Sequence, residues 1–301
     1  MSRELTLRTL PACLNALVPT FAHRAELGDV TLAYDECGPA NGPLALCLHG
    51  FPDTAHTFRY LAPFLAEKGY RVVVPAMRGY APSSLASSGD YHGSALAQDA
   101  NQLHDYLDGD ERAVLLGHDW GAGATYVATA KEPTRWRRAI TMAVPPPKMQ
   151  ALAFTRYEQV HASWYIFFFQ NVLAEQVVAL NDLAFLRELW HAWSPNYDSS
   201  DEMAPLHDAL SSPENLHAAL AYYRAIFAPR ALGTSPTPPP SVATLYLHGA
   251  DDGCILASGL KDVLEFLAPR SKFTLVENAG HFVHLEQPDA VHGAIAAFLD
   301  S

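Results

Sequence analysis

The sequence has few cysteines, no long apolar run and no cluster of basic residues. Its 4 cysteines are widely spaced and form no C-x-x-C pair, so we expect reduced thiols and a cytoplasmic location. The first residues lack the apolar core and the small-residue cleavage site of a signal peptide. No apolar stretch is long enough to cross a bilayer, so no membrane contact is expected.

Basic residues are also few: the chain has 20 Lys and Arg against 32 Asp and Glu, which gives a formal net charge of −12. This balance argues against a nucleic-acid partner or an anionic membrane surface. It permits a neutral substrate and disfavours an anionic one. With 49% hydrophobic and 17% charged residues among 301, the chain is expected to be globular, as one large domain or a domain with an insertion.

Apolar runs of strand length alternate with helix-length segments over the first half of the chain. Residues 21–27 and 30–36 flank Gly28-Asp29 and predict a β-hairpin. Further strands are expected at 44–48, 71–74, 113–116 and 139–144, with helices near 58–68, 93–107 and 122–131. This alternation favours an α/β fold with a mostly parallel sheet and helices on both of its faces.

The composition of the sequence changes after the proline run at 145–147. Residues 148–232 are rich in aromatics and predict helices without strands, and a proline-rich linker follows at 233–240. Strands resume at 243–247 and 273–276, and a helix is expected over 289–299. We predict a core domain of residues 21–144 and 241–301, with a helical cap of residues 145–240 inserted after the sixth strand. Residues 1–20 form an N-terminal extension whose leucines fit a surface helix, a lid or a dimer contact.

A strand, a sharp turn and a helix follow one another at residues 113–131. The turn reads G-H-D-W-G at 117–121, and small residues dominate the helix after it. Glycines on either side of one reactive residue are typical of the nucleophile elbow, in which Ser is the usual occupant. Asp119 stands at that position here, which changes the chemistry that the turn can perform.

Three other signals come at the ends of predicted strands, where open α/β sheets bind their ligands. They are H-G-F-P at 49–52, H-G-A-D-D at 248–252 and G-H-F at 280–282. The order of carboxylate elbow, acid and histidine along the chain matches the order of an α/β-hydrolase triad. His281 is the candidate base, although a histidine in such a loop is often only a surface residue. Asp251 and Asp252 compete for the role of the acid that orients it.

A carboxylate nucleophile is suited to an sp³ carbon that carries an activated leaving group. Attack by Asp119 forms an alkyl ester, whose carbonyl is then attacked by water that His281 deprotonates. An esterase is disfavoured because a carboxylate that attacks an ester would form an anhydride.

On these motifs, which extend over residues ~21–299, the chain resembles α/β-hydrolases of the epoxide hydrolase and haloalkane dehalogenase group. The resemblance implies that Asp252, rather than Asp251, orients His281. It also implies an oxyanion hole made of the backbone N–H groups of Phe51 and Trp120, which would contact the substrate as well.

Two segments of the predicted cap, S-W-Y-I-F-F-F-Q at 163–170 and Y-Y-R-A at 222–225, resemble the lid segments of epoxide hydrolases. The resemblance implies that Tyr165 and Tyr223 activate the epoxide oxygen and that Trp164 lines the substrate site. Tyr222 is an alternative to Tyr223. Both tyrosines would otherwise be packing residues of an aromatic cap.

The sequence therefore predicts an epoxide hydrolase that makes a vicinal diol from a small, neutral and apolar epoxide, without a cofactor or a metal, as a monomer or homodimer. A haloalkane dehalogenase is the first alternative. Haloalkane dehalogenases also have Trp at the position of Trp120, but Phe51 stands where one dehalogenase subgroup has Asn. Fluoroacetate dehalogenases have Arg after the elbow Asp, where this chain has Trp120. A non-catalytic relative is less favoured because every triad residue is present.

Overall fold

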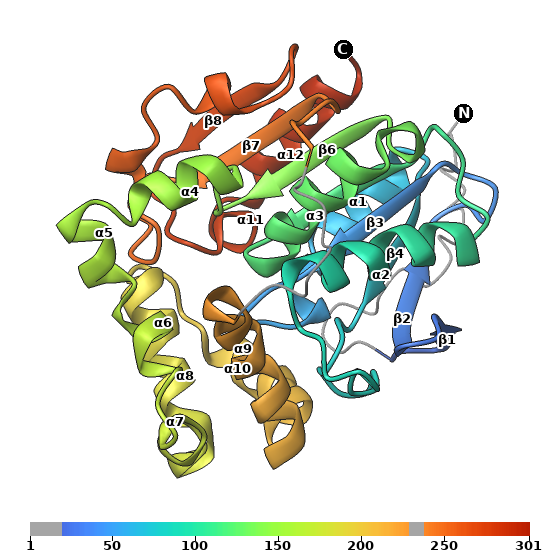
Figure 1. Cartoon of the computed structure of the whole chain (residues 1–301). Coiled ribbons are helices and arrows are strands. Elements are labelled where there is room, and N and C mark those ends of the chain that lie inside the picture. The colour runs from blue at the N-terminus through green and yellow to red at the C-terminus, as the bar shows by residue number, and fades with distance from the viewer. Residues whose placement is uncertain (1–19, 229–237) are drawn as a thin grey trace, which may run out of the picture.

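A computed structural model describes residues 20–228 and 238–301. Within them, eight strands form one sheet in the order β1-β2-β4-β3-β5-β6-β7-β8 (Figure 1). The strands are β1 His23–Glu26, β2 Thr31–Cys37, β3 Leu44–Leu48, β4 Arg71–Pro75, β5 Val114–His118, β6 Arg138–Met142, β7 Thr244–Gly249 and β8 Lys272–Val276. Strand β2 pairs with β1 and β4 antiparallel, and all other pairs are parallel. The predicted mostly parallel α/β fold is confirmed.

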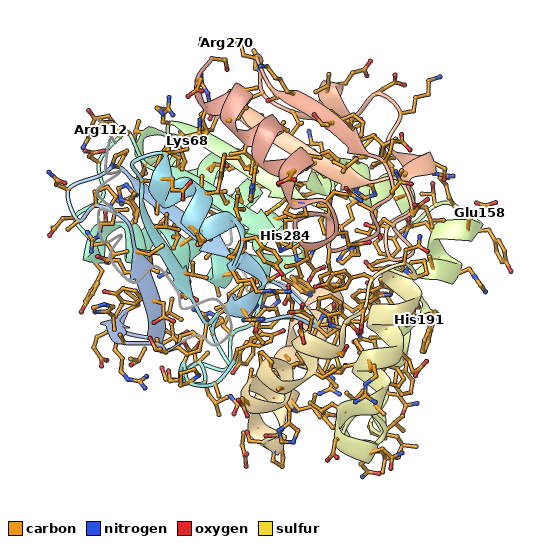
Figure 2. All side chains as sticks on the ribbon, turned by 180° about the vertical axis from the view of Figure 1, so that it is seen from behind. Lys68, Arg112, Glu158, His191, Arg270 and His284 are labelled. Atoms are coloured by element: carbon orange, nitrogen blue, oxygen red, sulfur yellow. The ribbon has the colours of Figure 1, made fainter. Side chains whose placement is uncertain are left out.

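The central strands are apolar along their whole length because both faces of the sheet are covered. In β3, Leu46 and Leu48 pack against helices α2 (Gly93–Tyr106) and α3 (Trp120–Lys131). Ala45 and Cys47 point the other way and pack against α1 (Leu61–Glu67) and α12 (Pro288–Leu299). In Figure 2 the labelled Arg112, Glu158 and Arg270 lie at the rim, whereas His284 of α11 (Val283–Glu286) lies near the centre of the view and is buried.

Seven helices connect β6 to β7, in the part of the insertion that the structure describes. They are α4 Pro147–Ala153, α5 Tyr157–Ala162, α6 Trp164–Phe168, α7 Ala174–Val178, α8 Leu180–Trp193, α9 Ser200–Leu210 and α10 Pro213–Phe227. In Figure 1, α6 to α10 form a separate lobe beside the sheet. The division into a core domain and a helical cap stays a prediction.

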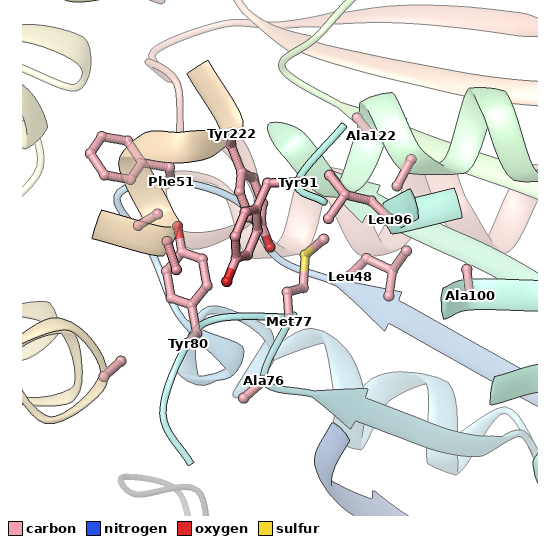
Figure 3. Packing of buried hydrophobic residues seen from close by; sticks show 14 of the residues in the cluster. Leu48, Phe51, Ala76, Met77, Tyr80, Tyr91, Leu96, Ala100, Ala122 and Tyr222 are labelled. Atoms are coloured by element: carbon pink, nitrogen blue, oxygen red, sulfur yellow. The ribbon is translucent and has the colours of Figure 1, made fainter. Parts of the chain in front are cut away.

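The lobe is tied to the core by buried polar contacts. Arg59 forms an ion pair with Glu202 of α9 at 2.6 Å, and both side chains are almost fully buried. The Tyr222 hydroxyl of α10 donates to the Arg78 carbonyl oxygen at 2.7 Å, and Figure 3 shows its ring beside Tyr91. The indole N–H of Trp190 in α8 donates to the Pro52 carbonyl oxygen at 2.6 Å. These contacts hold the cap helices against the loops that carry the predicted site.

Some expectations from sequence change in detail. The helix expected from residue 58 begins at Leu61, because a 3₁₀ turn, Ala55–Phe58, comes before it. Cys47 and Cys254 are free, buried thiols, but Cys37 is disulfide-bonded, so the expectation of reduced thiols is wrong for that residue. The predicted helix of the N-terminal extension and most of the proline-rich linker lie outside the described residues. Among the described helices, none has the length and apolar character needed to cross a membrane.

Candidate active site

Asp119 occupies the turn between β5 and α3 in a strained backbone conformation. Its φ of 51° and ψ of −115° lie outside the regions that non-glycine residues ordinarily adopt. The turn is held because the N–H groups of Ala122 and Gly123 both donate to the Asp119 carbonyl oxygen, at 3.0 and 3.1 Å. The buried carboxylate therefore stands at the carboxyl edge of the sheet, as the elbow pattern predicts.

The glycines of the elbow are required by close approach of backbone atoms. A Cβ at Gly117 would overlap the Gly121 carbonyl, and a Cβ at Gly121 would overlap the Leu48 carbonyl. A Cβ at Gly50 would collide with the Asp119 carboxylate. Each of these glycines thus lets two neighbouring segments pack closely enough to form the site.

We expect Gly121→Ala to destabilise the fold, because the added methyl group meets backbone atoms that cannot rotate away. The expected loss is about 3 kcal/mol in the free energy of unfolding, measured by urea denaturation. Gly123→Ala on the same helix is the matched control, because a Cβ there meets nothing within 4 Å. It should stabilise the helix by roughly 0.5–1 kcal/mol. Equal effects of the two substitutions would contradict this account of the elbow.

His281 lies in the loop after β8, between the side chains of Asp252 and Asp119. Its Nδ1 is 3.0 Å from Asp252 Oδ2, and its Nε2 is 3.6 Å from Asp119 Oδ2. Nε2 is buried and has no hydrogen-bond partner. The structure thus brings together the three predicted triad residues from three separate loops, with the free ring nitrogen facing the Asp119 carboxylate.

Asp252 is the buried member of the acidic pair, whereas Asp251 is exposed. Asp252 Oδ1 accepts hydrogen bonds from the backbone N–H groups of Cys254 and Ile255, at 2.7 and 2.9 Å. Burial alone would raise the pKa of this carboxyl, but the nearby His281 outweighs it, and the pKa is lowered. Asp252 is therefore a fixed negative charge beside His281.

The pKa of His281 is raised well above its ordinary value. Burial opposes this shift, and the negative charge of Asp252, together with the Asp119 carboxylate, outweighs burial. Protonation of the ring is therefore favoured relative to a free imidazole while Asp119 is charged. Any reaction that neutralises Asp119 removes part of that stabilisation and lowers the pKa of His281.

The predicted oxyanion donors differ in the contacts that they make. The Phe51 N–H donates to Asp119 Oδ1 at 2.7 Å, so it already points at a carboxylate oxygen. Among the hydrogen bonds of the described residues, none joins the Trp120 N–H to that carboxylate. Trp120 N nevertheless lies next to Gly50, close to the same oxygen.

Tyr165 of α6 and Tyr223 of α10 are both buried, with ring centroids 5.6 Å apart. The Tyr223 ring also packs edge-on against Phe51 and Trp120, at 5.2 and 5.1 Å. Its hydroxyl has no hydrogen-bond partner. Burial, with a further contribution from the negative charge of Asp119, raises the pKa of both hydroxyls well above 10. Both tyrosines therefore keep their protons.

Two other residues considered for the site, Tyr222 and Trp164, do not contact the residues described above in the predicted way. The Tyr222 hydroxyl is engaged by the Arg78 carbonyl, so Tyr222 does not replace Tyr223. Trp164 is 49% exposed, and its ring packs against Phe168 and Phe185 on the outside of the cap. The prediction that Trp164 lines the substrate site does not fit this position.

Sequence reasoning missed two residues that contact the predicted site residues. Cys254 Sγ lies 3.2 Å from the Tyr165 hydroxyl. The Trp193 ring of α8 lies 5.2 Å from the His281 ring, and the Trp193 carbonyl oxygen accepts a hydrogen bond from the His281 backbone N–H at 3.1 Å. Cys254 follows Asp252 by two positions, which is a usable signal. Trp193 lies in the cap, far along the chain, and no local motif marks it.

In the described part of the chain, two groups of side chains have their possible metal-ligand atoms within 4.8 Å of one another, close enough to bind a metal ion. One group contains Asp252, Cys254 and His281. Because Asp252 and His281 already form a hydrogen bond, we assign this group to the predicted triad. The other contains Asp53, His118 and His284, each with one buried atom that lacks a hydrogen-bond partner. It lies behind the elbow, where His118 Nε2 is 3.0 Å from the His281 carbonyl oxygen.

A carboxylate on a strained elbow, followed along the chain by an acid and a histidine at later strand ends, defines a hydrolase-type site on an α/β sheet. A family model described as the alpha/beta hydrolase fold matches residues 43–288. The chain belongs to this family.

Relatives of the chain carry the epoxide hydrolase name, which confirms the resemblance predicted from the motifs. Epoxide hydrolase 4 of Mus musculus is 28% identical over 305 residues, covering 96% of this chain and 82% of that protein. A structure described under novel epoxide hydrolases from metagenomes of hot environments has a TM-score of 0.78 and 27% identity, covering 92% and 97% of the two chains. The Bacillus megaterium epoxide hydrolase with an inhibitor, at TM-score 0.80 and 24% identity, covers 93% and 100% and shares the fold.

Proposed function

We propose that this protein is an epoxide hydrolase that converts an epoxide and water into a vicinal diol through an ester of Asp119. One observation carries the proposal: the buried rings of Tyr165 and Tyr223 lie 5.6 Å apart in the cap, and Tyr223 packs against Phe51 and Trp120, the two residues that flank the elbow carboxylate. Ring opening of an epoxide needs this combination of a nucleophile and an acid. The names of the relatives support the same activity.

In the first step, Asp119 Oδ2 attacks a ring carbon as the carbon–oxygen bond of the epoxide breaks. Tyr165 and Tyr223 hold the departing oxygen, and one of them gives it a proton. The Phe51 N–H stays bonded to Asp119 Oδ1 and stabilises the ester carbonyl that forms. The Trp120 N–H is the second donor that we assign to this oxygen. The product is a hydroxyalkyl ester of Asp119.

In the second step, water attacks the ester carbonyl while His281 Nε2 takes its proton. His281 Nε2 lies 3.6 Å from Asp119 Oδ2 and has no other hydrogen-bond partner, which supports this role for the ring once it is neutral. Asp252 holds the ring through Nδ1 and stabilises the imidazolium that forms. The ester then breaks, releasing the diol and restoring the Asp119 carboxylate.

The dehalogenase alternative differs in the leaving group. A halide leaves the substrate as an anion and needs N–H donors, whereas an epoxide oxygen stays attached and needs a proton. The two hydroxyl groups favour the epoxide. Styrene oxide and a 1-haloalkane, supplied separately, test this directly: diol without halide supports the proposal, and halide without diol refutes it. A small, neutral and apolar substrate and a cytoplasmic location stay predictions.

We expect His281→Gln to trap the ester, because ring opening survives without the base but hydrolysis does not. Intact-mass analysis after mixing with styrene oxide should show one substrate mass added to each chain, and ester hydrolysis should slow by about 10³-fold. Gln preserves the approximate size of the ring and cannot accept the water proton. His191→Gln, on the cap helix α8 and exposed, is the control and should turn over without an adduct. If the wild-type protein forms diol but the His281 variant shows no adduct, the ester intermediate is excluded.

A further inference from the structure

Cys254 is a buried thiol that takes no part in the two steps above, yet it lies between their acid and their base. Its Sγ is 3.2 Å from the Tyr165 hydroxyl and within 4.8 Å of a nitrogen of His281. Its backbone N–H is fixed by Asp252 Oδ1 at 2.7 Å. Cys254 and His281 are 0% exposed and Tyr165 is 4% exposed, so the three groups share one buried site.

Between the two proposed steps, the tyrosine that acted as the acid lacks a proton and His281 carries one. After ring opening, the tyrosine that served as the acid is a phenolate. The raised pKa of His281 favours a protonated ring beside the Asp119 carboxylate, and a protonated ring cannot accept a proton from water. A proton must therefore leave His281 and another must reach the tyrosine before the ester is hydrolysed.

We propose that Cys254 relays this proton from His281 to Tyr165 between ring opening and ester hydrolysis. The thiol S–H gives its proton to the Tyr165 phenolate oxygen, and the sulfur takes the proton from the His281 ring. No electrons are gained or lost, and Cys254 ends as the thiol it was before. His281 is then neutral and ready to act as a base, and it regains a proton when it deprotonates water. This inference rests on the proposed epoxide hydrolysis.

The direction of transfer follows from ordinary acidities and from the change in charge at Asp119. Unperturbed imidazolium, thiol and phenol have pKa values of about 6.5, 8.5 and 10. Burial raises the pKa of both the Cys254 thiol and the Tyr165 hydroxyl, whereas it lowers that of the His281 ring, so burial preserves this order. Ester formation also removes the negative charge that held the proton on His281. The Tyr165 hydroxyl is within hydrogen-bond distance of the thiol, and the Tyr223 hydroxyl has no hydrogen-bond partner, so we assign proton donation to Tyr165 and hydrogen bonding to Tyr223.

The test uses the full chain with Cys254→Ala and Cys254→Ser, followed by rapid mixing with styrene oxide. In the Ala variant, ester should form at the wild-type rate, but its hydrolysis should slow about tenfold or more. The near-ultraviolet absorbance of tyrosinate should rise together with the ester, and the defect should shrink as the pH rises, because His281 then loses its proton to solvent. Ser should restore both signals, since its hydroxyl donates and accepts at the same place. Cys254→Val keeps the volume without the proton and replaces Ala if that variant does not fold.

Wild-type hydrolysis and no tyrosinate signal in the Ala or Val variant would overturn the relay. An equal loss in the Ser variant, without tyrosinate, would assign the thiol to packing and overturn it as well. A wild-type protein that makes no diol from an epoxide refutes the proposed function itself. Diol formation that is unaffected by the substitution refutes the relay alone.

Discussion

Asp119→Ala is expected to reduce diol formation by at least about 10⁴-fold, because the proposed reaction has no other nucleophile. Asp119 is the only carboxylate that faces both the Phe51 N–H and His281 Nε2 among the contacts of the described residues. Water activated by His281 would have to open the epoxide directly, without the positioning that a side chain on the elbow provides. The rate is measured as diol formed per chain from styrene oxide.

The control for this substitution is Asp251→Ala, which removes an exposed carboxylate from the loop that carries Asp252. It should leave the rate of diol formation unchanged. Removing Asp119 also removes a negative charge beside His281, so the pKa of His281 should fall toward its ordinary value. Substantial diol formation by the Asp119 variant, with its fold intact, would mean that another group opens the ring.

The elbow was predictable from sequence because its requirements are local. The glycines at 117 and 121 relieve contacts within one turn and with the neighbouring strand, so their spacing alone marks the turn. The alternation of apolar runs likewise reveals the buried strands, because each central strand is covered on both faces. Such features depend on a few consecutive residues, and pattern reasoning captures them.

The choice between adjacent residues depended on tertiary structure. Asp251 and Asp252 are chemically identical, and the loop after β7 decides that only Asp252 turns inward to meet two backbone N–H groups. Trp164 and Tyr165 are neighbours on α6, but consecutive helical residues point about 100° apart, so only Tyr165 faces the site. The proximity of Cys254 to Tyr165 joins a core loop to the cap, and no spacing in the sequence encodes it.

The pair Tyr165→Phe and Tyr223→Phe is expected to lower diol formation by roughly 10³-fold, because the epoxide oxygen would leave without a proton or a hydrogen bond. Each substitution removes one hydroxyl and keeps the ring that packs in the cap. Single variants should retain part of the rate, since the remaining hydroxyl still stabilises the departing oxygen. The double variant should also form less Asp119 ester in the first turnover, which separates a defect in ring opening from one in hydrolysis.

Tyr222→Phe is the matched control, because its hydroxyl is equally buried but bonds the Arg78 carbonyl. It should cost about 1 kcal/mol of stability and leave ring opening intact. The two single variants should also differ. Tyr165→Phe removes the group that passes the proton, whereas Tyr223→Phe removes only a hydrogen bond, so Tyr165→Phe should have the larger effect on ring opening. Full diol formation by the double variant would show that the cap tyrosines only pack, and that the leaving oxygen is protonated from elsewhere.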